Sequence, residues 1–128
     1  MRPAYENINI GARRILIMEG IVNPIRMNDD SGLNKTEMED LDNILKSKGS
    51  EKYVHNDDYK IRMAVARYGY DIHNDELVYD ANAEVRNVVA RRLNEKYLKI
   101  LLDDADDAIA SYAYKYIRLI HKRDTVCM

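Results

Sequence analysis

Apolar residues in the second half of the chain recur in three segments that overlay with a 24-residue period, beginning at Tyr59, Ala83 and Asp107. Within each segment the apolar residues are three or four positions apart, which is the spacing of a helix with one buried face. No run alternates between apolar and polar residues, so no strand is expected. Four apolar columns run through the segments: Ile61, Val85 and Ile109; Val65, Val89 and Ala113; Tyr53, Leu77 and Leu101; Val54, Val78 and Leu102.

Polar residues predict where these helices begin. Asp58, Asn82 and Asp106 form a further column, and each can cap a new helix by accepting a hydrogen bond from an unpaired backbone amide. A shorter helical element is expected before each long one, around residues 74–80 and 95–103. A short fixed period indicates units that bury their apolar faces only by stacking. Residues 51–128 are therefore predicted to form an all-α, short right-handed α-solenoid of about three 24-residue repeats.

The first 50 residues do not follow this period, and residues 1–50 are predicted to form a two-helix N-terminal cap. The first helix is expected to start near Pro3 and to stop at Gly20. The second is expected to start at Asn34, with Glu37 completing a capping box, and to end at Gly49, after a loop at 28–32. The expected apolar faces are Ile8, Ala12, Ile15 and Leu16, then Met38, Leu41, Ile44 and Leu45.

Four stretches carry a family resemblance: IRMAVARYG at 61–69, LVYD at 77–80, VRNVVAR at 85–91 and LLDD at 101–104. They resemble the variant leucine-rich and HEAT-like α-solenoids over roughly half of the chain. The resemblance implies a helical scaffold that binds other molecules. Some variant leucine-rich proteins hold an iron–sulfur cluster on clustered cysteines, but this chain has a single cysteine, Cys127, so no such cluster is expected.

The resemblance also implies a structural role for paired charges. Arg62 and Arg86 share one column, Asp80 and Asp104 share another, and in this kind of fold the two columns can pair between neighbouring units. The third unit has Ala110 in the arginine column, as expected of a terminal unit. The acidic run 103–107 is accordingly interpreted as a helix end followed by an N-cap, and not as a cation site.

Composition limits the function classes. The chain has 128 residues, a net charge of −2, 46% hydrophobic residues and one cysteine, which is typical of a single small domain. No apolar run approaches a membrane span, and no export signal is recognised, so a cytoplasmic location is expected. Two His-Asn-Asp tripeptides, at 55–57 and 73–75, do not fit the 24-residue period, so they are interpreted as turns and caps and no metal site is predicted.

The sequence contains no recognisable catalytic or phosphate-binding motif, so we expect a non-enzymatic protein without a cofactor. The predicted function is protein–protein interaction, by analogy as a small phage or mobile-element inhibitor or adaptor of a host defence protein. The alternative is a HEAT-like nucleic-acid-binding module that uses a basic column, and a homodimer is a third hypothesis. The predicted contact residues are basic or tyrosine, because Arg and Tyr are common at binding hot spots: Arg67, Arg91, Lys115, Tyr70, Tyr79, Tyr97 and Tyr114.

Overall fold

The computed structural model describes residues 4–24 and 32–126, and this part of the chain contains eight helices and no strand. The prediction of an all-α fold is confirmed. Pro3, Cys127 and positions 28–31 of the predicted loop lie outside the described residues. The helices are α1 (Ala4–Met18), α2 (Lys35–Lys46), α3 (Glu51–Val54), α4 (Tyr59–Tyr68), α5 (Asp71–Leu77), α6 (Ala83–Arg91), α7 (Glu95–Leu101) and α8 (Asp107–Val126).

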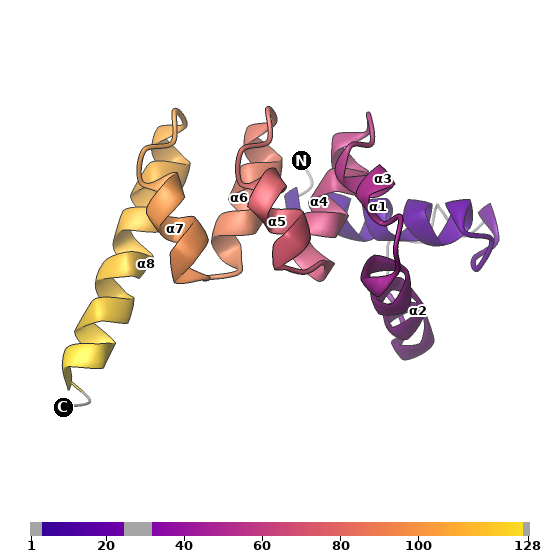
Figure 1. The fold of residues 1–128 in the computed structure, drawn as a ribbon, viewed down its shortest axis with the longest axis horizontal. Helices are drawn as coiled ribbons and strands as arrows, with labels where there is room; N and C mark the ends of the chain where they lie inside the picture. Colours follow the sequence, from indigo (N-terminus) through magenta and orange to yellow (C-terminus); the bar gives the residue numbers. More distant parts are fainter. Residues whose placement is uncertain (1–3, 25–31, 127–128) are drawn as a thin grey trace.

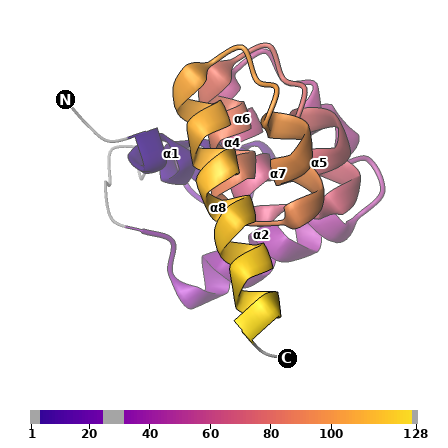
Figure 2. The same ribbon diagram turned by 90° about the vertical axis from the view of Figure 1, so that its left-hand side faces the viewer.

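The longer helices of the second half lie side by side in the order α4, α6, α8 (Figure 1). Viewed along this row, the short helices α5 and α7 flank it on one side, while α1 covers α4 on the other (Figure 2). Helix α2 packs against both α1 and α4. The core therefore runs between the row of long helices and the elements that flank it.

The predicted apolar columns form this core. Every member of the four columns is buried except Leu102, which is half-buried and packs against the core. The predicted face of the first helix is buried as well, from Ile8 to Leu16. In α2, Leu41 and Leu45 are buried, but Met38 keeps 40% of its surface exposed, so its assignment to the apolar face was wrong.

The predicted caps are also present. The side chains of Asp58 and Asn82 accept hydrogen bonds from the second amide after each of them, at 2.9 and 2.7 Å, and Asp106 accepts one from the amide of Ala108 at 2.9 Å. Asn34 and Glu37 form the predicted capping box at the start of α2. Asx oxygens thus set where α2, α4, α6 and α8 begin.

Helix α1 packs directly against the backbone of α4 at Gly11. A Cβ atom added at Gly11 would lie 1.9 Å from the carbonyl oxygen of Lys60, so only glycine leaves room for the α4 backbone. Nearby, the buried Arg13 forms an ion pair with Glu37 at 2.9 Å and donates to the carbonyl of Gly32 at 3.1 Å. These contacts fix α1 to both α4 and the start of α2.

None of the described helices combines the length and the apolar character that crossing a bilayer requires.

Candidate interaction surface

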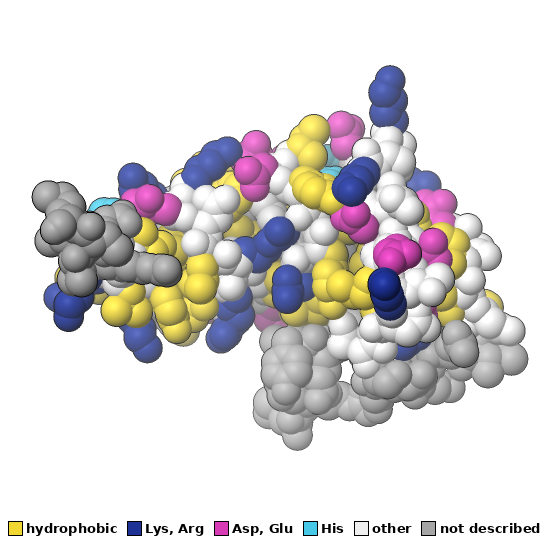
Figure 3. Space-filling view, turned by 90° about the horizontal axis from the view of Figure 1, so that it is seen from below, with side chains coloured by type: hydrophobic (Ala, Val, Ile, Leu, Met, Phe, Trp, Pro, Cys, Tyr) yellow, Lys and Arg dark blue, Asp and Glu magenta, His cyan; other side chains and the backbone are white. Residues whose placement is uncertain are grey.

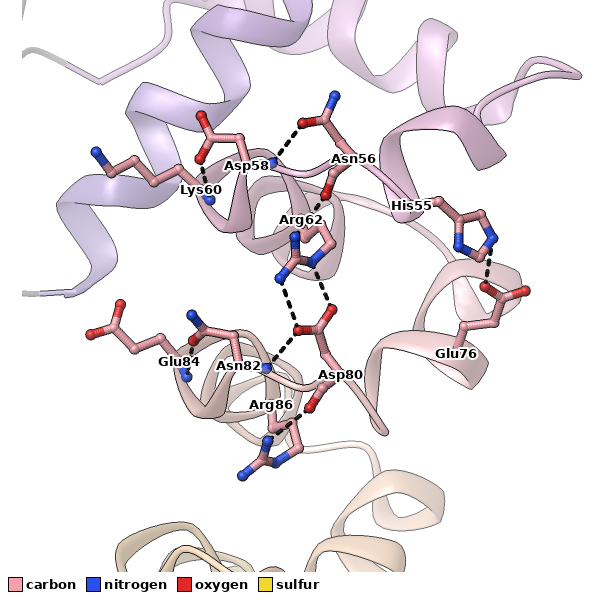
Figure 4. Close-up of polar contacts among 10 residues, drawn as sticks. All are labelled: His55, Asn56, Asp58, Lys60, Arg62, Glu76, Asp80, Asn82, Glu84 and Arg86. Atoms are coloured by element: carbon pink, nitrogen blue, oxygen red, sulfur yellow. Dashed lines mark hydrogen bonds and ion pairs between the residues drawn. The ribbon is translucent and has the colours of Figure 1, made fainter.

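The two ends of the α4–α6–α8 row carry different arrangements of charge. At the end where the helices begin, Arg62 binds Asp80 through two hydrogen bonds of 2.8 and 3.2 Å, and Arg86 binds Asp104 through two of 2.7 and 3.1 Å. A third nitrogen of Arg86 donates to the carbonyl of Asp80 at 2.7 Å (Figure 4). The predicted pairing of the two columns is confirmed, and each arginine is neutralised by a bidentate contact with a carboxylate.

Replacing Arg86 with lysine should lower the free energy of unfolding by about 1 kcal/mol, because an ammonium group cannot reproduce three directed contacts. Chemical denaturation at neutral pH measures this. The matched control is Arg91→Lys, an exposed arginine without a carboxylate partner among the described residues, and it should change stability by less than about 0.5 kcal/mol. Equal losses in both variants would show that the pair is not structural.

At the opposite end, where α4 and α6 end, the cations lie against tyrosine rings and not against carboxylates. The guanidinium of Arg67 lies 5.4 Å from the ring of Tyr68, and that of Arg91 lies 5.1 Å from the ring of Tyr112 on α8. Lys115 lies 5.4 Å from the ring of Tyr116. These distances suit cation–π contacts, which orient a cation without cancelling its charge.

A groove connects α1, α4 and α6 at this end. It has a volume of about 450 Å³, its apolar lining is Ile8 and Val88, and its basic lining is Arg67, Arg91 and Arg92. Arg92 has a separate structural role, because it donates to the carbonyls of Ala66 and Gly69 at the end of α4. Burial, helped by the nearby Arg67, lowers the pKa of Arg92. Arg67 and Arg91 remain to face solvent.

Helix α8 continues the same surface. A second open groove, of about 680 Å³, is lined by Tyr114, Lys115, Arg118, Leu119, His121 and Lys122. Tyr114 and Leu119 are 58% and 48% exposed, and the guanidinium of Arg118 lies 5.6 Å from the ring of Tyr114. Figure 3 shows the molecule from below, with dark-blue Lys and Arg side chains, yellow apolar side chains and several magenta Asp and Glu side chains on the face in view.

We define the basic surface as five exposed cations that have no ion pair to any carboxylate among the described residues. Most other described cations are paired. Lys35, Lys48, Lys60 and Arg92 also lack a carboxylate partner, but the three lysines lie on other parts of the chain and Arg92 donates to backbone carbonyls at the end of α4. A chain with a net charge of −2 therefore has, along α4, α6 and α8, a group of cations that line two grooves and that pair with no described carboxylate. The members of the basic surface are Arg67, Arg91, Lys115, Arg118 and Lys122.

The predicted contact tyrosines do not all reach this surface. Tyr97 is only 1% exposed, and its hydroxyl donates to Asp75 at 2.8 Å, so its prediction as a contact residue was wrong. Burial, reinforced by that hydrogen bond, raises the pKa of Tyr97. Tyr79 is 69% exposed but lies in the turn that precedes α6, whereas Arg91 is the last residue of α6. Tyr70 donates to Asp42 and ties the end of α4 to α2, which leaves Tyr114 as the tyrosine best placed beside the cations.

One buried polar pair resembles a nucleophile and its base. Ser50 Oγ lies 2.9 Å from Nε2 of His73, while Nδ1 of His73 accepts a hydrogen bond from the backbone amide of Tyr70 at 2.8 Å. Because Nδ1 accepts, the proton of the neutral ring resides on Nε2, which donates to Ser50. A general base would need a free lone pair at that nitrogen. The pair thus links α3 to α5 and is not arranged to activate a serine.

His73 makes stability depend on pH. Burial lowers the pKa of His73, so the unfolded chain, with a histidine pKa of about 6.5, binds the proton first. The His73 contribution to stability is therefore complete above about pH 6.5 and is lost as pH falls below it, by at most about 1.4 kcal/mol per pH unit. Urea denaturation at pH 7 and pH 5 measures this loss. It should be smaller in His73→Asn, whose side-chain oxygen still accepts from Tyr70; an unchanged loss would contradict the assignment.

The described residues contain no group of three or more His, Cys, Asp or Glu side chains able to hold a metal ion. His55 lies 3.1 Å from Glu76, the residue after the second tripeptide, and His73 is buried beside Ser50. In the acidic run, Asp104 binds Arg86 and Asp106 caps α8. These contacts agree with the interpretation of the acidic run, and residues 55–57 form the turn after α3. Residues 73–75 lie inside α5, so the interpretation of that tripeptide as a turn and cap was wrong.

Sequence reasoning missed two parts of the surface. The spacing of Tyr68, Tyr112 and Tyr116 predicts only that they fill the stack, yet their half-buried rings also support the three cations. The placement of Arg67 beside Tyr68 and of Lys115 beside Tyr116, at the same register of two different repeats, was the available signal. Ile8 comes from outside the 24-residue period, so no column could place it in the groove.

Comparisons of the chain with protein-family models, with curated proteins and with solved structures found no significant match.

Proposed function

We propose that this chain is a short right-handed α-solenoid that binds another protein stoichiometrically and has no catalytic role. The 24-residue spacing of its caps and of its Arg–Asp pairs supports the solenoid. The basic surface carries the binding proposal, because exposed Arg and Tyr beside grooves with some apolar lining are typical of interaction sites. A small adaptor or inhibitor, of the kind phages and mobile elements encode, and located in the cytoplasm, is the specific role that we infer.

The test is affinity capture from a nuclease-treated lysate of the encoding cell, followed by mass spectrometry and light scattering. We expect a nuclease-resistant complex with a fixed ratio of chain to partner protein. Recovery of the chain alone, as a monomer or as a homodimer, would contradict the proposal.

A nucleic-acid-binding module is the second candidate, and one observation favours it. The cations of the basic surface lack carboxylate partners among the described residues, as expected of side chains that contact phosphates. Loss of every partner after nuclease treatment, together with a DNA or RNA mobility shift that weakens steeply with salt, would establish this candidate instead.

A further inference from the structure

We propose that the basic surface binds an acidic amphipathic segment of the partner protein, in which carboxylates contact the cations and apolar side chains enter the grooves between them. The inference rests on the proposed function, since it takes the partner to be a protein. It adds the location of the docking face and the chemistry of the segment that occupies it.

Charge complementarity is the first argument. At the other end of the row, Arg62 and Arg86 already hold carboxylates of this chain. Arg67 lies on the same helix as Arg62, and Arg91 on the same helix as Arg86. Both face solvent, and neither has a carboxylate partner among the described residues. A planar guanidinium can donate two hydrogen bonds to one carboxylate. A partner that supplies Asp or Glu would therefore give Arg67 and Arg91 the same kind of pair that Arg62 and Arg86 form within the chain.

The apolar lining distinguishes an acidic polypeptide from nucleic acid. Ile8 and Val88 line the groove between the arginines, and Tyr114 and Leu119 stand exposed beside the cations of α8. Ile8 and Val88 expose only 7% and 4% of their surface, so the apolar surface open to a partner is mainly that of Tyr114 and Leu119, and a phosphate backbone would leave this surface uncovered. An amphipathic polypeptide uses both kinds of side chain, because buried apolar area supplies affinity and the charges supply orientation.

The cations are also held in place before any partner arrives. Arg67, Arg91 and Lys115 each lie against a tyrosine ring, at 5.4, 5.1 and 5.4 Å. A stacked side chain has fewer rotamers to lose when it binds, so less of the interaction free energy is consumed in ordering it.

The span of the surface sets the length of the segment. Packed helices lie 8–10 Å apart, so the distance from the α4 position to the α8 position is roughly 20 Å. A helix covers roughly 20 Å with about 13 residues. A probe of about 16 residues is therefore long enough to reach from Arg67 to Lys115.

The test uses the full chain and fluorescence anisotropy with labelled probes. The first probe is a 16-residue peptide that repeats Leu-Glu-Glu-Glu, and its matched control has Gln for every Glu. The other probes are a 16-nucleotide single strand and a 16-base-pair duplex of DNA. Two triple variants are compared with the wild type: Arg67→Gln, Arg91→Gln, Lys115→Gln on the surface, and Lys35→Gln, Lys48→Gln, Lys60→Gln as a control with the same change in net charge.

We expect the wild type to bind the acidic peptide more tightly than the Gln peptide and either DNA. The surface variant should bind it about 10- to 100-fold more weakly, as expected for the loss of three exposed charge contacts, and the control variant should stay within about 3-fold of the wild type. Circular dichroism confirms that both variants keep the helical fold. Failure of the wild type to bind the peptide, equal weakening in both variants, or tighter binding of DNA would overturn the proposal.

Affinity capture with the surface variant separates this inference from the proposed function. A protein captured by the wild type and lost by the surface variant supports both. If the wild type and the surface variant capture the same protein equally well, the docking face lies elsewhere, and only the inference is overturned. Absence of any nuclease-resistant protein partner overturns both.

Discussion

Replacing Gly11 with alanine should lower the free energy of unfolding by about 3 kcal/mol, because the added methyl group collides with backbone rather than with a movable side chain. Its Cβ would lie 1.9 Å from the carbonyl oxygen and 2.5 Å from the carbonyl carbon of Lys60. On helix propensity alone the same substitution would stabilise α1 by up to about 1 kcal/mol. The sign of the change therefore reports the contact between α1 and α4.

Thermal unfolding followed by circular dichroism measures this effect, and a loss of about 3 kcal/mol corresponds to a fall in Tm of roughly 10 °C for a domain of this size. The matched control is Gly32→Ala, because the nearest atom to a Cβ at Gly32 lies 4.0 Å away, on the side chain of Asn9. The control should melt within a few degrees of the wild type. A rise in Tm for Gly11→Ala would show that α1 does not pack on α4 in this way.

A Glu37→Gln variant should lose a similar amount, about 3 kcal/mol, because it removes the negative charge from a buried ion pair with Arg13. The two side chains are only 4% and 7% exposed, and their ion pair measures 2.9 Å. Glutamine keeps an oxygen that can accept from the amide of Asn34, so the capping box survives and the missing charge is isolated as the cause.

Chemical denaturation at neutral pH tests this variant. The control is Glu76→Gln, whose partner His55 is mostly exposed; that pair should be worth less than about 0.5 kcal/mol. If Glu37→Gln proves as stable as the control, the ion pair is not what holds α1 to α2.

The sequence predicted those parts of the fold that repeat. The caps at Asp58, Asn82 and Asp106, the buried columns and the Arg–Asp pairs each appear at a fixed interval, so every copy confirms the others. The helices and the residues at which they begin follow from the local spacing of apolar residues and from Asx side chains. Both can be recognised in a single sequence without information on long-range contacts.

The parts that do not repeat could not be predicted in this way. The approach of Gly11 to Lys60 joins two helices that are far apart in sequence, and nothing local marks it. The sequence places Tyr97 on the surface because it lies near the end of an element, whereas its ring is buried and its hydroxyl is satisfied by Asp75 and by the carbonyl of Asp71. Tyrosine fits both environments, so its sequence position does not decide between them.

The basic surface was predicted in part. Arg67, Arg91 and Lys115 share one column, and the structure places them at equivalent positions of α4, α6 and α8. Their lack of carboxylate partners among the described residues depends on where the carboxylates of neighbouring helices lie, and two of these, Asp80 and Asp104, bind Arg62 and Arg86. A net charge of −2 concealed this separation, because it sums over both ends of the row.

The most direct test of the binding account is photo-crosslinking from single positions in the encoding cell. A photoreactive phenylalanine derivative would replace Arg91, in the groove, and Lys48, in the turn between α2 and α3, in separate samples. We predict a covalent protein adduct at position 91 that survives nuclease treatment, and none at position 48. An adduct at position 48 alone, or an adduct at position 91 that nuclease removes, would contradict the account.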